Sequence, residues 1–150
     1  MQRSQPLASI LFVLIGCQLR YWLPAPLTPS ERSLLGCYVV QTGPWPDSNP
    51  STGTVRVQFD TLRWRDGAQR RLLILDSSKQ RQPLAYWAPL RPDSLLLRIG
   101  EGVEGQGLEI RLQVTGDSLH GVATNHIWGD ISRSALARGT RSSCPSPASQ

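Results

Sequence analysis

The sequence predicts an all-β domain, a meandering antiparallel barrel or sandwich, that follows a short N-terminal export segment. Three observations predict this fold. Apolar and polar residues alternate along several short segments, which is typical of strands with one buried face. The 13 glycines and 12 prolines are spread along the chain and are too many for a helical bundle. No segment after residue 36 has a helical period, and 150 residues suit a single domain.

The chain begins with an apolar segment, residues 7–15, that follows a basic residue and has the length of an export signal. It is too short to span a membrane as a helix. It ends in Leu14-Ile15-Gly16-Cys17, which resembles the lipobox of bacterial lipoproteins. The resemblance implies that Cys17 is acylated and that the chain is cleaved before it, so that Cys17 becomes the new N-terminus. The alternatives are an ordinary signal peptide or a buried strand with an incidental cysteine.

Gln18 follows this cysteine, where an aspartate would resemble an inner-membrane retention signal. The resemblance therefore implies a lipoprotein of the bacterial outer membrane that faces the periplasm or the cell surface. Two or three acyl chains would hold it stably, which one chain does only marginally. The mature chain would have 134 residues (150 − 16). Without Arg3 it would carry 15 basic against 11 acidic groups, a net charge of +4.

A proline-rich segment precedes the predicted domain and is expected to act as a tether from the lipidated N-terminus. Within it, Thr28 and the Pro-Ser-Glu that follows are typical of a helix start, with threonine as the N-cap and glutamate three residues later. This helix is expected to make one turn and to end at about Leu35. The predicted signal peptide, tether, barrel domain and disordered tail cover residues 1–16, 17–33, 34–144 and 145–150.

Residues 36–42 form the first predicted strand. In the second strand, Val57 and Phe59 alternate with polar residues, and the alternation then slips by one position. After the slip Leu62 and Trp64 continue the buried face. A slip of this kind indicates a β-bulge.

Six further strands complete the predicted meander of eight. The Asp-Gly pair at residues 66–67 is a strong hairpin signal, and turn signals at residues 92–93 and 116–117 separate later strands. The clearest alternation runs from residue 108 to residue 114. The six strands are predicted over residues 71–75, 84–88, 94–99, 108–114, 118–124 and 131–139.

Two cysteines remain once Cys17 is assigned to lipid. Cys37 and Cys144 lie near the two ends of the predicted domain, and an even pair in an exported chain predicts a disulfide because the periplasm is oxidising. Two free thiols and half of a metal site are the alternatives. The sequence has no Cys-x-x-Cys motif, and its only histidines are His120 and His126, so no metal site is predicted.

The start of the first strand, Leu-Gly-Cys-Tyr at residues 35–38, resembles the Gly-x-Trp motif of the lipocalins. Residues 117–123 also resemble a late-strand pattern of small lipocalin-like barrels. The resemblance implies a small eight-stranded up-and-down barrel. It further implies that Tyr38, in place of the usual tryptophan, plugs the barrel floor, and that Arg138, or else Arg141, lies across its ring.

The same resemblance implies a carrier, because an eight-stranded barrel can hold one small ligand. The inward positions are apolar, so the ligand is expected to be a lipid or another hydrophobic molecule, and no cofactor is predicted. The residues expected to contact the ligand are Phe59, Trp64, Trp87, Leu97 and Ile110. The other positions expected to face inward are Val55, Val57, Leu95, Leu108, Leu112 and Val114.

The alternative function is an envelope interaction or inhibitor module that works through its loops. Eight short strands with large aliphatic residues can fill the interior of a barrel completely. Some periplasmic lysozyme inhibitors are disulfide-linked barrel lipoproteins of this size. A net charge of +4 would repel a basic lysozyme, however, which argues against that partner.

Two further classes are not favoured by the sequence. Its 16 basic residues are scattered singly, and the nearest approach to a cluster, at residues 63–71, lacks the pattern of a nucleic-acid binder. Residues 100–105 match Gly-x-Gly-x-x-Gly, but a strand follows where a dinucleotide site needs a helix. His120, His126, Asp117 and Asp130 lack a nucleophile in a recognisable elbow. The sequence therefore predicts no enzyme, and it leaves the oligomeric state open.

Overall fold

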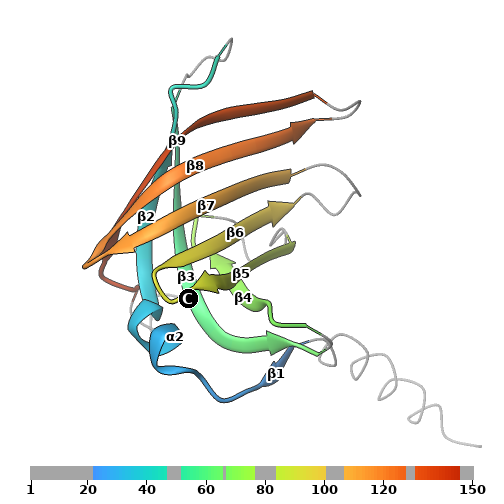
Figure 1. The fold of residues 1–150 in the computed structure, drawn as a ribbon, viewed down its shortest axis with the longest axis vertical. Coiled ribbons are helices and arrows are strands. Elements are labelled where there is room, and N and C mark those ends of the chain that lie inside the picture. The colour runs from blue at the N-terminus through green and yellow to red at the C-terminus, as the bar shows by residue number, and fades with distance from the viewer. Residues whose placement is uncertain are drawn as a thin grey trace, which may run out of the picture.

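Eight strands of this protein form a closed barrel, in which each strand pairs in antiparallel fashion with the next barrel strand along the chain and the last pairs with the first (Figure 1). The computed structural model describes residues 22–46, 52–65, 67–76, 84–100, 107–127 and 131–145. The barrel strands are β2 (Gly36–Thr42), β3 (Gly53–Trp64), β4 (Arg70–Ile74), β5 (Leu84–Arg91), β6 (Ser94–Gly100), β7 (Gly107–Thr115), β8 (Ser118–Ile127) and β9 (Ile131–Ser142). The prediction of a small eight-stranded up-and-down barrel is confirmed.

A ninth strand lies outside the barrel wall, where the sequence predicted only a tether. Strand β1 (Trp22–Pro24) pairs with the end of β3, with Trp22 opposite Trp64 and Pro24 opposite Leu62. Proline lacks a backbone donor, so it is tolerated at such an edge. The sequence signal was weak because only three residues take part and two prolines follow closely.

The one helix among the described residues, α2 (Pro29–Leu34), forms where the capping residues predicted it. The Thr28 side-chain oxygen accepts a hydrogen bond from the backbone N–H of Glu31 at 3.3 Å. In return, a Glu31 carboxylate oxygen accepts from the backbone N–H of Thr28 at 2.7 Å. This reciprocal capping box satisfies two donors that a helix start otherwise leaves unpaired.

The β-bulge predicted in the second barrel strand is confirmed. The pairing of β3 with β4 shifts register between Phe59 and Arg63. Before the shift Val57 and Phe59 are buried, and after it Leu62 and Trp64 are only half-buried. The bulge lets the 12-residue strand serve the barrel with its first part and pair with β1 at its end.

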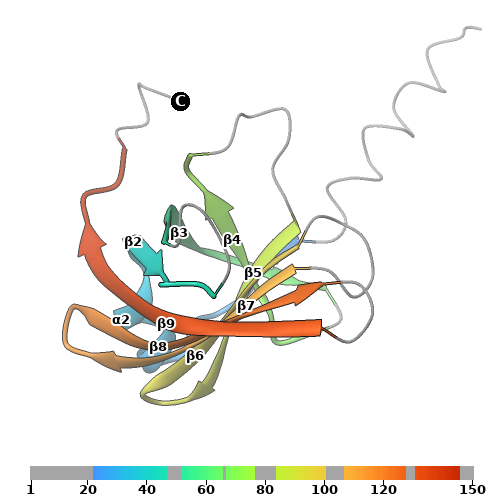
Figure 2. The ribbon, with the colours of Figure 1, turned by 90° about the horizontal axis from the view of Figure 1, so that it is seen from above.

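The inward side chains form one apolar core, around which the strands curve when viewed from above (Figure 2). We call the end covered by α2, where β2 begins and β9 ends, the floor, and the opposite end the mouth. The floor half of the core contains its large rings. The mouth half has small side chains on its wall, namely Ala85, Ala123, Ala135 and Ala137.

Cys37 and Cys144 form the predicted disulfide, with their Cα atoms 5.1 Å apart. The bond joins the start of β2 to the segment after β9, so it ties both ends of the barrel chain together at the floor. Cys37 is fully buried. Cys17 and the predicted signal peptide lie outside the residues that the structure describes. None of the helical residues described forms a segment long and apolar enough to span a bilayer.

Candidate functional site

The floor of the barrel contains a buried ion pair that the sequence did not predict. Arg70 at the start of β4 is 2% exposed, and Glu31 in α2 is 5% exposed. The guanidinium donates to both carboxylate oxygens, from Nε at 2.7 Å and from Nη2 at 3.1 Å. The two residues are 39 positions apart in the chain. No local pattern could have brought them together in a prediction.

Arg70 uses its remaining donors on backbone carbonyls. Its Nη1 donates to Thr61 at 2.6 Å and to Ala25 at 3.4 Å, and its Nη2 donates to Pro26 at 2.7 Å. With the two bonds to Glu31, all five guanidinium N–H groups have acceptors. The hydrogen bonds of this buried pair are therefore all satisfied. Through them Arg70 connects β4 to α2, to the β3 bulge and to the segment after β1.

The pair also determines the charge state of Glu31. The hydrogen bonds from Arg70 lower its pKa from 4.5 to about 2, helped by those from Thr28 and opposed by burial. Glu31 is therefore ionised at any pH near neutrality. It cannot serve as a general acid there.

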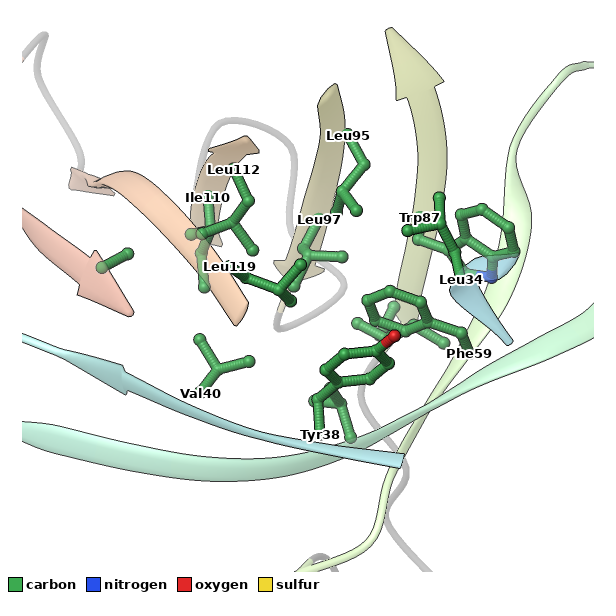
Figure 3. Close-up of a cluster of buried hydrophobic side chains, with 14 of the residues drawn as sticks. Leu34, Tyr38, Val40, Phe59, Trp87, Leu95, Leu97, Ile110, Leu112 and Leu119 are labelled. Atoms are coloured by element: carbon green, nitrogen blue, oxygen red, sulfur yellow. The ribbon is translucent and has the colours of Figure 1, made fainter. Parts of the chain in front are cut away.

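Next to this pair, three aromatic rings stack across the floor (Figure 3). Tyr38 and Phe59 have ring centroids 4.8 Å apart, and Phe59 and Trp87 have centroids 5.3 Å apart, with interplanar angles of 25° and 18°. The indole N–H of Trp87 donates to the carbonyl of Asp60 at 3.2 Å. Burial raises the pKa of Tyr38 above its usual value. Tyr38 is thus buried in the floor and stacked on Phe59.

The cation over Tyr38 is Arg141, and the assignment of this role to Arg138 was wrong. The guanidinium carbon of Arg141 lies 5.2 Å from the centre of the Tyr38 ring. Its nitrogens also donate to the carbonyls of Leu35 at 3.0 Å and Ser33 at 2.6 Å. Strand alternation explains the correction, because the odd positions of β9 face inward, whereas Arg138 points outward and is exposed.

Gly36 makes this arrangement possible. It has a φ of +135°, which favours glycine, and a Cβ there would lie 3.2 Å from a guanidinium nitrogen of Arg141. The glycine of the motif at residues 35–38 is thus required by its backbone conformation, and the guanidinium of Arg141 lies close against it.

Four of the five residues predicted to contact a ligand are part of the packed core. Phe59 is 2% exposed, and Trp87, Leu97 and Ile110 have no exposed surface. Figure 3 shows these side chains directed into the same interior. A side chain without accessible surface touches no void that could hold even a water molecule. In the closed barrel, these residues therefore contact one another and leave no room for a ligand at their surfaces.

The fifth residue, Trp64, lies elsewhere. It is the last residue of β3, beyond the bulge, and its ring packs edge-on against Trp22 of β1 with centroids 5.1 Å apart. It does not belong to the buried core cluster. The prediction that Trp64 shares a site with the other four is therefore wrong, because the end of β3 serves the β1 pairing.

The mouth is covered by Trp45, which the sequence analysis did not single out. Its ring packs against the core, and its indole N–H donates to the side chain of Thr42 at 3.2 Å. The backbone N–H of Gly43 donates to the carbonyl of Leu136 at 2.9 Å, which holds this segment on β9. Val55, Ile99 and Leu108, on strand segments that end at the mouth, also pack against the core and are only partly buried.

The outer surface has an apolar pair between two hollows. Val122 of β8 and Leu136 of β9 face each other in register and are 47% and 57% exposed. Leu136 and Arg138 line a hollow of about 330 Å³ near the end of β2. Val122 lines another of about 420 Å³ beside the β5–β6 turn. We call Val122, Leu136 and the flanking Arg111, His120 and Arg138 the outer wall.

The titratable residues considered as an acid–base set are not brought together. His120 lies on the outer wall, and His126 is six residues further along the same strand, roughly 20 Å away at the usual rise per residue. Asp117 pairs with Arg141 at 3.0 Å, and Asp130 lies outside the described residues. Within the described ranges, no group of three or more His, Cys, Asp or Glu side chains is placed to hold a metal ion.

The chain matches no protein-family model, no curated protein and no solved structure.

Proposed function

We propose that this chain is a lipid-anchored protein of the bacterial outer membrane that acts as an interaction module through the outer wall of a packed barrel. The anchor is supported by the lipobox-like Leu14-Ile15-Gly16-Cys17. The Cys37–Cys144 disulfide supports an oxidising compartment. One observation favours interaction over transport of a ligand: eight inward side chains have no exposed surface. They are Val40, Val57, Trp87, Leu95, Leu97, Ile110, Leu119 and Ala123.

The chemistry of the outer wall suggests its partner. Single exposed aliphatic residues are common on proteins, but Val122 and Leu136 lie opposite each other between two concave areas. Exposed Arg138 borders this pair, as does Arg111, which pairs with Glu109 at 2.9 Å, and the mature chain would carry a net charge of +4. An envelope protein with an acidic rim around an apolar contact would complement this wall.

The anchor has a direct test. Replacing Cys17 with serine should abolish incorporation of labelled fatty acid and release the protein from the membrane fraction, because the thiol is the site of acylation. Labelling and fractionation in a host with lipoprotein processing would measure both. A Cys144→Ser protein, which keeps Cys17, should still take up the label. Full labelling of the Cys17→Ser protein would contradict the proposed anchor.

The outer wall is tested by crosslinking in intact cells. A photoreactive residue at position 136 should give one discrete adduct with an acidic envelope protein. Adding Val122→Glu should reduce its yield at least tenfold, since a charge then replaces the apolar contact. Position 84 is the matched control, because Leu84 is exposed to a similar extent, 52%, on another part of the barrel. Equal adducts at both positions, or no effect of Val122→Glu, would contradict the assignment of the wall.

A second candidate is the carrier function that the lipocalin resemblance implied. The composition of the mouth half favours it: its wall has small alanine side chains, and Val55, Ile99 and Leu108 are only partly buried. If Trp45 swings away, an apolar chain of modest size can enter there, above the packed floor. This candidate requires saturable binding of a fatty acid that changes tryptophan emission and is altered by Trp45→Phe. The packed-barrel proposal requires that no such binding occurs.

A further inference from the structure

The segment that connects the proposed anchor to the barrel is much shorter than the sequence suggested. The proline-rich residues 17–33 were expected to form a tether, but residues 22–33 belong to the folded domain. Strand β1 starts at Trp22 and α2 starts at Pro29. Only residues 18–21 therefore lie between Cys17 and the first residue of the structure that is paired in the sheet.

The docked part of this segment is held by several contacts. The strand β1 pairs with β3 over three residues. Arg70 donates to the carbonyls of Ala25 and Pro26, and Arg32 donates to the carbonyl of Leu27 at 3.3 Å. Peeling residues 22–27 from the barrel would therefore remove two carbonyl acceptors from the buried guanidinium of Arg70. The segment is thus part of the floor and does not extend the tether.

A short linker restricts how far the domain can stand from the bilayer. Five residue steps separate Cys17 from Trp22, and a fully extended chain covers at most about 3.6 Å per step, or roughly 18 Å in total. The polar headgroup region alone is roughly 5–8 Å deep on each side of a bilayer. An acylated Cys17 would therefore keep β1 at or next to the headgroups, whatever path residues 18–21 take.

The residues at this place are those that favour a membrane interface. Trp22 and Trp64 pack against each other, and Leu23 is 44% exposed. Arg63, opposite Leu23 in the sheet, and Arg65 are exposed. Neither arginine forms an ion pair with a carboxylate of the described residues. Tryptophan rings gather at headgroup depth, and arginine extends its charge to the phosphates.

We propose that Trp22, Leu23, Arg63, Trp64 and Arg65, which we call the basal corner, rest on the anionic phospholipid headgroups of the membrane that holds Cys17. The proposal rests on the proposed lipidation and adds an orientation to it. Figure 1 shows β1 and the end of β3 at the bottom of the molecule, while the end of β2 and the start of β3 lie at the top. The barrel would therefore stand with its floor on the membrane, and the mouth would point away from it.

The test uses the full-length acylated protein in vesicles of phosphatidylethanolamine and phosphatidylglycerol at 3:1, with and without brominated acyl chains. Flotation with the vesicles is measured first and reports the anchor. Tryptophan quenching by the brominated lipid is measured next and reports the basal corner. Trp22→Phe/Trp64→Phe should lose at least half of the quenching, because these two rings lie at the interface. Trp45→Phe, which alters the mouth, should keep the quenching of the two basal rings.

Charge reversal gives a second readout that does not disturb the ring pair. Arg63→Glu/Arg65→Glu should reduce the quenching at least twofold, and the remaining quenching should depend less on salt, since two headgroup contacts are lost. The matched control is Arg56→Glu/Arg138→Glu, which reverses two exposed arginines nearer the mouth. Failure to float would overturn the anchor and this proposal with it. Flotation with no quenching, or equal effects of the two double reversals, would overturn the orientation alone.

Discussion

Replacing Arg70 with methionine should lower the free energy of unfolding by about 3–5 kcal/mol, because the Glu31 carboxylate would stay buried without its cation. The carbonyls of Thr61 and Pro26 would also lose their donor. Urea denaturation followed by tryptophan emission would measure the change. The matched control is Arg71→Met, which removes the partly exposed ion pair of Arg71 with Asp60 one position away.

The control should cost no more than about 1 kcal/mol, since exposed pairs contribute little. The double substitution Glu31→Gln/Arg70→Met should recover part of the loss, because no charge then stays buried. If Arg70→Met costs no more than Arg71→Met, the floor ion pair does not hold the barrel together as argued here.

The same pair predicts how stability changes in acid. The pKa of Glu31 is about 2 in the folded protein, whereas an unperturbed glutamate has a pKa of 4.5. Its ionised form is therefore stabilised by folding. This contribution is fully present above about pH 4.5 and is lost as the pH falls toward about 2. One pKa unit corresponds to about 1.4 kcal/mol, so the loss amounts to about 3 kcal/mol. Glu31→Gln should lack this part of the acid sensitivity.

Loss of the Cys37–Cys144 disulfide should have an effect of similar size. The two cysteines are 107 positions apart, and closing a loop of that length restricts the unfolded chain by about 4.7 kcal/mol in the chain-entropy description. Reduction, or Cys144→Ser, should therefore shift the urea midpoint strongly downward. The third cysteine offers the control, because Cys17→Ser removes a thiol outside this loop and should leave the midpoint unchanged. A shift below 1 kcal/mol on reduction would contradict the assigned role.

Both effects are located at the floor, where the proposed anchor also enters the domain. The disulfide joins the two ends of the barrel chain there, and the ion pair joins the segment after β1 to α2 and β4. If the basal corner rests on the membrane, the most strongly cross-linked end of the protein is the end held on the bilayer. The outer wall would then be free to meet a partner that approaches from the aqueous side.

Most local features of this fold were predictable from the sequence, although strand β1 was not. Alternation of apolar and polar residues indicated each barrel strand, because side chains of a strand point to opposite faces in turn. The phase slip after Phe59 indicated the bulge, and Thr28 with Glu31 indicated the helix start. The pairing of Cys37 with Cys144 followed from the count of cysteines in an exported chain.

Residues close in the chain, or a simple count, were therefore enough to predict the fold class, the barrel strands and the disulfide. They could not predict which distant residues meet. These contacts are Arg70 with Glu31 across 39 positions, Arg141 instead of Arg138 over Tyr38, and Trp64 with Trp22 outside the core. Such contacts depend on how the closed barrel brings the strand ends together at the floor. The spacing of residues along the chain does not indicate which strand ends meet at the floor, because the same local pattern is compatible with many distant partners.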